Sequence, residues 1–300
     1  MAYTEIKVRN ARKYYYRALS IRQGASVFKK RKYLGADLSR KDLAGAEKEA
    51  DRLMAVMESL LTDQEIVFLE RIKLEHARKP PETLQARYRE FATLYTHNST
   101  AIEGNTLTLS ESERLMLEDL TPAGKSYIEV CETIGHARAF DSMLAHDGKI
   151  TKRFICELHE MAMRGASSPK FHTEIGRYRN VPAYIEGQDW KPPEPEEVAR
   201  EMRKLLSWCS RKKSTLHPLV LAVRFLAEFE RVRPFTDGNG RVGRLLMNFI
   251  MHREGYPMVS IPSVLKHRYH EALDKAIQAG DLRPFLEFML ELLEEDGPDF

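Results

Sequence analysis

The feature that most constrains this chain is the stretch RPFTDGNGRVGR at residues 233–244, which runs directly into an apolar helical pattern. Two glycines flank an asparagine, and Arg241 and Arg244 follow at a spacing that projects both from one side of a helix. Backbone N–H groups at a helix N-terminus form a natural seat for an anion. Asp237 adds a hard oxygen ligand, of the kind that holds Mg²⁺ against a phosphate. The stretch therefore predicts a phosphate-binding loop.

A simpler interpretation is that Gly-Asn-Gly is a turn and that the arginines are solvated surface. Here, however, an aspartate, an asparagine and two arginines fall within eight residues, against a helix start. This combination favours the phosphate-binding interpretation.

The composition bounds the class of protein. A hydrophobic fraction of 43% is ample for a buried core, and a charged fraction of 30% indicates a soluble surface. There is no run of eighteen apolar residues and no secretory h-region, so we expect a cytoplasmic protein without a membrane partner. The three cysteines are widely spaced and odd in number, which predicts free thiols and no zinc site.

The N-terminal region differs from the rest of the chain. Residues 1–40 carry eleven Lys or Arg against two Asp or Glu, and residues 12–35 are rich in tyrosine and β-prone. A break at Gln23-Gly24 predicts a basic β-hairpin. Its charge suits a nucleic acid or an acidic partner. Because no nucleic-acid-binding motif accompanies it, the sequence favours a β-ribbon with solvated lysines.

From Asp37 nearly to the end, apolar residues recur with a helical period. Residues 176–187 alternate enough to predict a short hairpin, the one β feature expected in the main body, and residues 190–195 form an extended connector. The predicted helices include residues 43–60, 66–74, 84–95, 110–117, 127–144, 150–163, 196–209, 218–229, 245–250, 272–279 and 284–293.

The third of these helices ends in the sequence NSTAIEGN at residues 98–105. Ser99 and Glu103 share one helix face, and Gly104 can end the helix. A glutamate at this position lies at the negative end of the helix dipole, which is unfavourable without a cationic partner. Judged locally, the sequence favours a solvated carboxylate.

The loop closely resembles the signature of the Fic (Fic/Doc, or Fido) family, His-Pro-Phe-x-Asp/Glu-Gly-Asn-Gly-Arg-x-x-Arg. Ser99-Thr-Ala-Ile-Glu103-Gly104 is similar to the inhibitory motif of that family, Ser/Thr-x-x-x-Glu-Gly/Asn. Residues 176–187 resemble its β-hairpin flap, and residues 190–198 resemble the Pro-rich connector behind the flap. Together with matches at residues 268–281, the resemblance extends over residues 80 to 290.

The resemblance implies a mainly α Fic fold with a short β-hairpin flap, in addition to the basic N-terminal hairpin. It also implies AMPylation, in which AMP moves from Mg²⁺-bound ATP to a Ser, Thr or Tyr hydroxyl and pyrophosphate leaves. The acceptor would be a protein target or the chain itself. Members with this arrangement often form homodimers.

Individual residues take roles from the same resemblance. Asp237 would hold the Mg²⁺, Phe235 would anchor the loop, and Arg244 would lie nearest the γ-phosphate. The remaining nucleotide-binding positions would be Gly238, Asn239, Gly240 and Arg241. The target-aligning flap positions would be Arg179, Val181 and Tyr184, through strand addition.

The resemblance changes the interpretation of Glu103. In the family this glutamate pairs with the second motif arginine and blocks the productive γ-phosphate position. Ser99, Glu103 and Gly104 would then form an inhibitory motif, and Arg244 would supply the missing cation.

One motif position departs from the family. The signature begins with a histidine that removes the proton from the attacking hydroxyl, and this chain has Arg233 there. A guanidinium has five donors and no acceptor, and it stays charged at neutral pH, so it cannot take that proton. As a third cation, Arg233 can instead strengthen phosphate binding.

Four functions therefore remain open: an autoinhibited and weakened adenylyltransferase, an ATP-binding pseudoenzyme or regulatory protein, an AMP-removing hydrolase, and a nucleic-acid-binding regulator. The expected organisation is a basic hairpin (1–36), N-terminal helices including the inhibitory one (37–105), a Fic core (106–290) and an acidic tail (291–300).

Overall fold

The computed structural model describes residues 2–9, 11–23, 26–58, 60–166, 174–184 and 190–295. The chain divides into two compact units, Met1–Asp63 (unit 1) and Gln64–Phe300 (unit 2). The boundaries expected at residues 36, 105 and 290 stay predictions. Within the described ranges, no helix is both long enough and apolar enough to cross a membrane.

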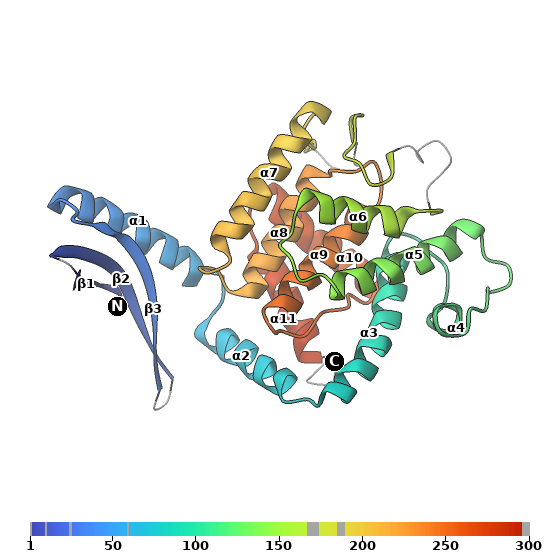
Figure 1. Cartoon of the computed structure of the whole chain (residues 1–300), viewed down its shortest axis with the longest axis horizontal. Coiled ribbons are helices and arrows are strands. Elements are labelled where there is room, and N and C mark those ends of the chain that lie inside the picture. The colour runs from blue at the N-terminus through green and yellow to red at the C-terminus, as the bar shows by residue number, and fades with distance from the viewer. Residues whose placement is uncertain are drawn as a thin grey trace. The chain divides into compact units, whose positions relative to one another are not determined.

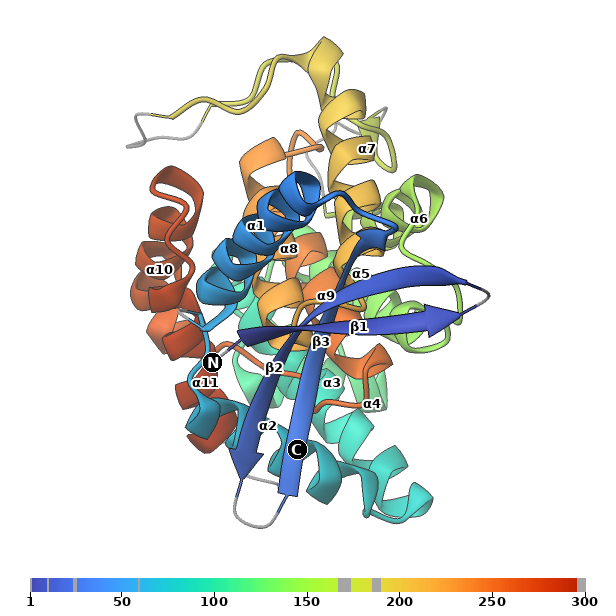
Figure 2. The ribbon, with the colours of Figure 1, turned by 90° about the vertical axis from the view of Figure 1, so that its left-hand side faces the viewer.

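Unit 1 is a three-stranded antiparallel sheet with one helix (Figures 1 and 2). The strands β1 (Ala2–Arg9), β2 (Arg12–Gln23) and β3 (Ser26–Ala36) follow one another in sequence order. The helix α1 (Arg40–Glu58) contacts β2 and β3. The predicted hairpin corresponds to β2 and β3. Strand β1 was not predicted, although its polar and apolar residues alternate as they do in a half-exposed strand.

The two faces of this sheet have different environments. Thr4 pairs with Arg17 in the strand register, and both side chains contact Glu47 of α1. Tyr15, on the same face, is buried. Because side chains alternate between faces along a strand, Tyr14 and Tyr16 belong to the face opposite α1.

Unit 2 is helical, and every helix that the sequence predicts there is present, although α9 and α10 each begin six residues earlier than predicted. Thr151 caps α6, since its side chain accepts a hydrogen bond from Phe154 N. The helices are α2 (Asp63–Ala77), α3 (Pro81–Ile102), α4 (Leu109–Glu118), α5 (Tyr127–Leu144), α6 (Lys152–Met163), α7 (Pro195–Lys212), α8 (Pro218–Val232), α9 (Asn239–Arg253), α10 (Lys266–Gln278) and α11 (Arg283–Glu295), with a 3₁₀ turn at Ser263–Leu265.

The helices α8 and α9 form the centre of unit 2. The helix α8 contacts α7, α9, α10 and α11, while α9 contacts α3, α5, α6 and α8 (Figure 1). Most side chains of α9 are buried, so the helix has little freedom to move against its neighbours. The first turn of α9, which carries the predicted anion seat, is therefore held by packing on several sides.

The flap prediction is only partly covered by the structure. Residues 174–184 are described and contain no strand, so the hairpin expected from residue 176 is wrong as far as Tyr184. Residues 185–187 lie outside the described residues. The described segment instead hydrogen bonds to the motif loop through Arg179 N and Pro234 O, at 2.8 Å. That contact satisfies a backbone donor that a hairpin ladder would otherwise satisfy.

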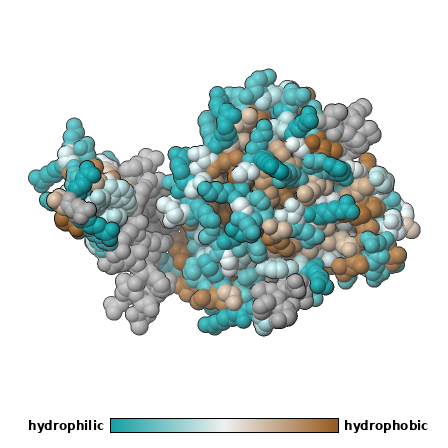
Figure 3. Space-filling model, in the orientation of Figure 1, coloured by the Kyte–Doolittle hydropathy of each residue, from teal (hydrophilic) through white to brown (hydrophobic). Residues whose placement is uncertain are grey.

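The surface of unit 2 is mixed in character. Hydrophilic residues predominate in Figure 3, and hydrophobic ones gather over α4 and the beginning of α5. Exposed apolar residues in this region include Leu117, Leu120 and Tyr127. The three cysteines are free thiols, as the sequence predicts.

Two helical glycines give a test of the packing between α5 and α6. A Cβ at Gly135 would lie 2.5 Å from the carbonyl oxygen of Met161, whereas nothing lies within 4 Å of a Cβ at Gly45 in α1. Gly135→Ala should therefore destabilise unit 2 by roughly 1–3 kcal/mol through overpacking. Gly45→Ala should be neutral or stabilise its helix by up to about 1 kcal/mol. Urea unfolding checks both, and equal effects of the two substitutions would contradict the tight α5–α6 contact.

Candidate active site

The motif loop connects two buried helices through two left-handed residues. Arg233 ends α8 with φ 44°, and its N–H donates to Phe229 O at 2.9 Å. Gly238 precedes α9 with φ 75°, and a Cβ there would come within 2.6 Å of Met163 Sδ. Glycine is required at this position because the backbone is left-handed and the space is filled.

The loop is held in shape by its own asparagine. Asn239 Oδ1 accepts from Phe235 N at 2.9 Å, and Asn239 Nδ2 donates to Phe235 O at 2.8 Å. The Phe235 ring is fully buried and stacks on His159, with ring centroids 3.7 Å apart. These contacts agree with an anchoring role for Phe235, and they leave the Asn239 backbone, not its side chain, for ligand binding.

His159 of α6 is a site residue that the sequence analysis missed. Its Nε2 contacts Asp237 O at 3.0 Å, and its Nδ1 accepts from Gly176 N at 2.9 Å. Since a carbonyl can only accept, Nε2 carries the proton. Burial lowers the pKa of His159 to about 4. With both nitrogens engaged, His159 positions the loop and has no free lone pair with which to replace the motif histidine.

Arg179 also holds the loop, whereas the sequence analysis expected it to align a target. Its Nε donates to Arg233 O at 2.7 Å, and its Nη2 donates to Pro193 O at 2.6 Å. The residue is 2% exposed. Val181 and Tyr184, by contrast, are exposed, and their role towards a target stays a prediction.

The first motif arginine, Arg241, lies in a network of acidic groups. It forms ion pairs with Glu132 of α5 and with Asp237, the latter at 3.0 Å. Glu132 also accepts from Asn105 Nδ2 at 2.8 Å. Burial raises the pKa of Glu132, although the Arg241 guanidinium opposes the shift. Within the described part of the chain, the buried Nε of Arg241 has no hydrogen-bond partner, so one donor is left for a ligand.

The second motif arginine, Arg244, is almost fully buried and is bound by the end of α3. Its Nε donates to Ser99 Oγ at 3.1 Å, and its Nη2 donates to Ser99 O at 2.8 Å. The same Nη2 pairs with Glu103 Oε1 at 2.9 Å. The guanidinium also lies over the ring of Tyr269, 5.8 Å from its centroid.

The end of α3 is held against α9 through one connecting segment. Asn98, the residue before Ser99, donates from its Nδ2 to Ser260 Oγ at 3.0 Å. Asn248 of α9 bonds both backbone groups of Val259, at 2.8 and 2.9 Å. This arrangement fixes the register in which Ser99 and Glu103 meet Arg244.

Glu103 lies directly over the first turn of α9. A Cβ added at Gly240 would collide with Glu103 Oε1. Burial alone would raise the pKa of the Glu103 carboxyl, but the guanidinium groups of Arg244 and Arg241 outweigh it and lower the pKa. The local expectation of a solvated carboxylate is therefore wrong, because its cationic partner comes from a helix 141 residues away. Gly104, with φ 106°, ends the helix as predicted.

A buried carboxyl group faces Arg233. Glu230 Oε2 lies 3.9 Å from Arg233 Nη1, and the Glu230 side chain is 8% exposed. Burial raises the pKa of Glu230 to about 7, and the positive charge of Arg233 limits the rise. The sequence analysis missed this residue, although its position one helical turn before Arg233 was a readable signal.

The residues of the loop fit a Mg²⁺-bound nucleotide better than a bare metal ion. Among the described residues, no group of three or more His, Cys, Asp or Glu could hold a metal ion. Asp237 is a single exposed carboxylate, at 59% exposure, beside the start of α9. One carboxylate together with ligand phosphates is a common Mg²⁺ environment. The unpartnered Arg241 Nε fits the phosphate side of such a ligand.

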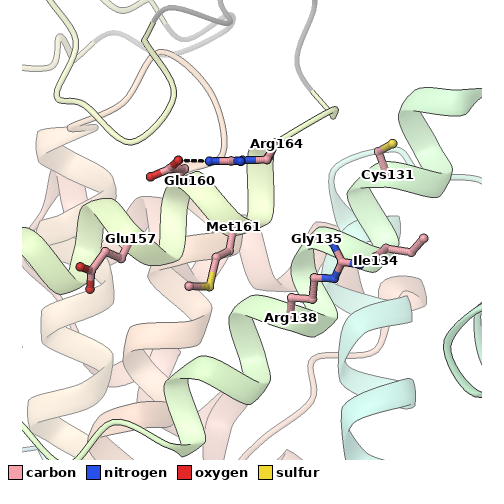
Figure 4. A pocket seen from close by; sticks show the side chains of 8 residues that line it. All are labelled: Cys131, Ile134, Gly135, Arg138, Glu157, Glu160, Met161 and Arg164. Atoms are coloured by element: carbon pink, nitrogen blue, oxygen red, sulfur yellow. Dashed lines mark hydrogen bonds and ion pairs between the residues drawn. The ribbon is translucent and has the colours of Figure 1, made fainter.

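A separate pocket of about 490 Å³ opens between α5 and α6 (Figure 4). The residues that line it are Cys131, Ile134, Gly135, Arg138, Glu157, Glu160, Met161 and Arg164. Glu160 and Arg164 form an ion pair at its edge. It includes none of the motif residues, so it adds nothing to the chemistry of the loop.

Comparisons with known proteins agree with this geometry. Residues 149–251 match the model of the Fic/DOC family. A protein adenylyltransferase Fic from Nematostella vectensis is 35% identical over 205 residues, which cover 67% of this chain and 46% of the relative. The Drosophila erecta protein of the same name is 31% identical over 293 residues, which cover 95% of this chain and 54% of the relative.

Solved structures show the same fold. Fic-1 (residues 134–508) from C. elegans matches with a TM-score of 0.68 and 28% identity, covering 87% of this chain and 76% of that one. A Fic domain containing signalling protein from Bacteroides thetaiotaomicron matches with a TM-score of 0.69 and 27% identity, covering 77% and 94%.

The fold and the site define a helical protein in which a glycine-rich loop leads into a buried helix with two arginines in its first turns. The chain belongs to the Fic/DOC family. It spans about half the length of the curated relatives that it matches.

The raised pKa of Glu230 predicts a pH-dependent stability. Between the ordinary glutamate pKa and about 7, the folded chain holds a proton that the unfolded chain releases. The contribution of this proton to the free energy of unfolding is fully present below the pKa of Glu230 in the unfolded chain. It is lost as the pH rises through 7. When the pH rises from 5 to 8, the free energy of unfolding of Glu230→Gln should therefore increase by roughly 2–3 kcal/mol relative to that of the unmodified chain. Urea unfolding at both pH values measures the change.

The charged and titratable groups that act on Glu230 are Arg233, Glu103, Arg244 and Tyr269. Glu228→Gln is the matched control, because that carboxylate lies on the same helix but is partly exposed. A pH dependence that is identical in all three proteins would contradict a proton on buried Glu230.

Proposed function

We propose that this chain transfers AMP from Mg²⁺-bound ATP to protein hydroxyl groups, as an adenylyltransferase that is autoinhibited through Glu103 and slowed by Arg233. The observation that carries the proposal is the Glu103–Arg244 pair over the first turn of α9. The relatives named protein adenylyltransferase support the type of reaction. The acceptor is another protein or a copy of this chain.

The nucleotide binds at the start of α9 in this proposal. The first backbone N–H groups of a helix have no partners within the helix, and here no side chain caps them. They can therefore bind phosphate oxygens, with the helix dipole adding to the attraction. Arg241 contributes its free Nε donor, and Arg244 contributes a fixed positive charge.

Asp237 would hold Mg²⁺ at the open edge of this seat. A bound Mg²⁺ supplies charge neutralisation along the phosphate chain. One Asp237 oxygen already accepts from Gly238 N and from Arg241, which orients the carboxylate. Because Gly240 has no side chain, the space beside it is open, and the phosphates and the Glu103 carboxylate compete for that space.

Inhibition follows from competition between two anions for one cation. The Glu103 carboxylate accepts a hydrogen bond from the Nη2 group of Arg244, and it lies against the first turn of α9. A γ-phosphate bound to Arg244 would meet a negative charge at close range, which disfavours it. A nucleotide can still bind through its other phosphates, but in a position that does not favour transfer.

Transfer also needs an acceptor for the hydroxyl proton. The oxygen attacks the α-phosphorus, the bond to the bridging oxygen of the β-phosphate breaks, and the hydroxyl proton must leave. Arg233 has no lone pair to receive it. We propose that Glu230 takes this proton, because its carboxyl is the acidic group that pairs with Arg233 and is about half ionised near pH 7.

A second candidate is an ATP-binding pseudoenzyme with a regulatory output. The observation in its favour is Arg233 itself, whose side chain is 30% exposed and adds a cation beside the seat. In that case the nucleotide binds and no AMP is transferred.

A transfer assay separates the two candidates. The chain is incubated with ATP labelled at the α-phosphate, Mg²⁺ and a protein lysate, and the label on protein is measured. We expect a weak signal from the unmodified chain and a stronger one from Glu103→Gly. Arg233→His should add roughly 10²–10⁴-fold by restoring a proton acceptor. Glu118→Gly is the control, because Glu118 also ends a helix but lies outside the motif network.

Labelling by the unmodified chain or by Glu103→Gly would exclude the pseudoenzyme. Labelling that appears only after Arg233→His would support the pseudoenzyme. If a chain that carries both Glu103→Gly and Arg233→His also transfers no label, the adenylyltransferase proposal is wrong.

The role of Glu230 has its own test. In the Glu103→Gly background, the transfer rate should rise with pH through about 7, as the Glu230 carboxyl loses its proton. Glu230→Gln should lower the rate and remove that rise, whereas Glu228→Gln should preserve both. A Glu230→Gln protein that keeps the same pH profile at a lower rate would assign Glu230 to positioning Arg233.

A further inference from the structure

The sheet of unit 1 has a tyrosine-rich face that the Fic chemistry does not use. In the strand register, Tyr16 pairs with Glu5 and with Tyr33, while Tyr14 pairs with Lys7. Paired residues of antiparallel strands share a face. The tyrosine face therefore consists of Tyr3, Lys7, Tyr14, Tyr16 and Tyr33, with Glu5 as its acidic residue.

Three of the rings on this face, those of Tyr14, Tyr16 and Tyr33, form a continuous platform. The Tyr16 and Tyr33 centroids are 5.3 Å apart, and those of Tyr14 and Tyr33 are 6.5 Å apart. The Lys7 ammonium lies 5.6 Å from the Tyr16 ring centroid. Tyr33 is 52% exposed and Tyr3 is 37% exposed. These rings are large, partly exposed and next to a cation.

The opposite face is the one that α1 occupies. Thr4 and Arg17 contact Glu47 of α1 from that side, and Tyr15 is buried there. Within unit 1, the packing of the helix thus stabilises the sheet without using the tyrosine face.

The sequence around this platform is strongly basic. Residues 1–36 contain ten lysines and arginines against one glutamate, and KKRK at residues 29–32 lies within β3. A basic surface attracts a polyanion such as a nucleic acid backbone. Basic charge alone would suit any polyanion, but exposed aromatic rings add a preference for partners with flat π-faces.

We propose that the tyrosine face of this sheet binds single-stranded nucleic acid. Bases stack on the tyrosine rings, and basic side chains of the same face, such as Lys7, bind the phosphates. Tyr14 and Tyr16 are two residues apart along one strand, which separates them by roughly 7 Å. Bases in a duplex repeat about every 3.4 Å and are already stacked. The spacing therefore favours an extended strand whose bases are free to separate.

Fluorescence anisotropy of the full chain with labelled 20-nucleotide probes tests the proposal. We expect oligo-U and oligo-dT to bind, with an affinity that falls as KCl rises. Tyr16→Ala and Tyr33→Ala should each raise the Kd roughly 5- to 100-fold, because each removes a stacking surface. Tyr33→Phe should keep the affinity, since the ring remains. The oligo-U and oligo-dT arms show whether RNA or DNA is preferred.

Val8→Ala is the matched control, because Val8 is exposed on the other face of β1. Circular dichroism of each variant shows whether the sheet is intact. No binding at low salt, equal losses in Val8→Ala and Tyr33→Ala, or equal affinity for a duplex of the same length would overturn the proposal. Equal binding to vesicles of anionic lipid or to a poly-glutamate peptide would overturn it as well, because charge alone would then explain the affinity.

Discussion

The buried guanidinium of Arg244 is the constraint on which the rest of the site depends. A charge that is almost fully buried requires paired and hydrogen-bonded surroundings, and α3 supplies them through Ser99 and Glu103. Since α3 and α9 are both hydrogen bonded to residues 259 and 260, the buried Arg244 meets a partly exposed Glu103 in a fixed register. The same charge attracts phosphate. One residue thus links the stability of the helix bundle to the inhibition of nucleotide binding that we propose.

A second network makes the loop rigid before any ligand arrives. Asn239 fixes the Phe235 backbone, His159 fixes the Asp237 carbonyl, and Arg179 bonds to the carbonyl of Arg233. Preorganised donors cost little reorganisation when charge develops, which suits the phosphate binding that we propose. The substitution at position 233 leaves this framework in place. In the function that we propose, Arg233 removes the proton acceptor of the motif, because a guanidinium cannot accept a proton, and it adds a positive charge beside the phosphates.

The sequence was sufficient for the helices, since they depend on local periodicity. The phosphate-binding role of the loop, inferred from the order of its residues, stays a prediction. Prediction failed where a partner comes from far along the chain. Glu103 looked solvated until its pairing with Arg244 was considered, and that pairing came from a family resemblance rather than from the local residues. His159 and Arg179 act on the loop through contacts with residues 78 and 54 positions away, respectively. The position of Glu230 one helical turn before Arg233 could be predicted from the sequence, but its raised pKa depends on burial that only the fold reveals. Strand β1 and the absence of strands in residues 174–184 likewise depend on tertiary pairing.

The most direct test of the central claim is calorimetric titration of Mg²⁺-bound ATP and of AMP into the unmodified chain, Glu103→Gly and Glu118→Gly. We expect Glu103→Gly to bind ATP roughly tenfold or more tightly than the unmodified chain does, because Arg244 gains a charge-assisted contact with the γ-phosphate. AMP, which lacks that phosphate, should bind with little change, and Glu118→Gly should match the unmodified chain for both ligands. An ATP affinity that Glu103→Gly does not change, or an equal gain for ATP and AMP, would contradict the claim that Glu103 and the terminal phosphate compete for Arg244.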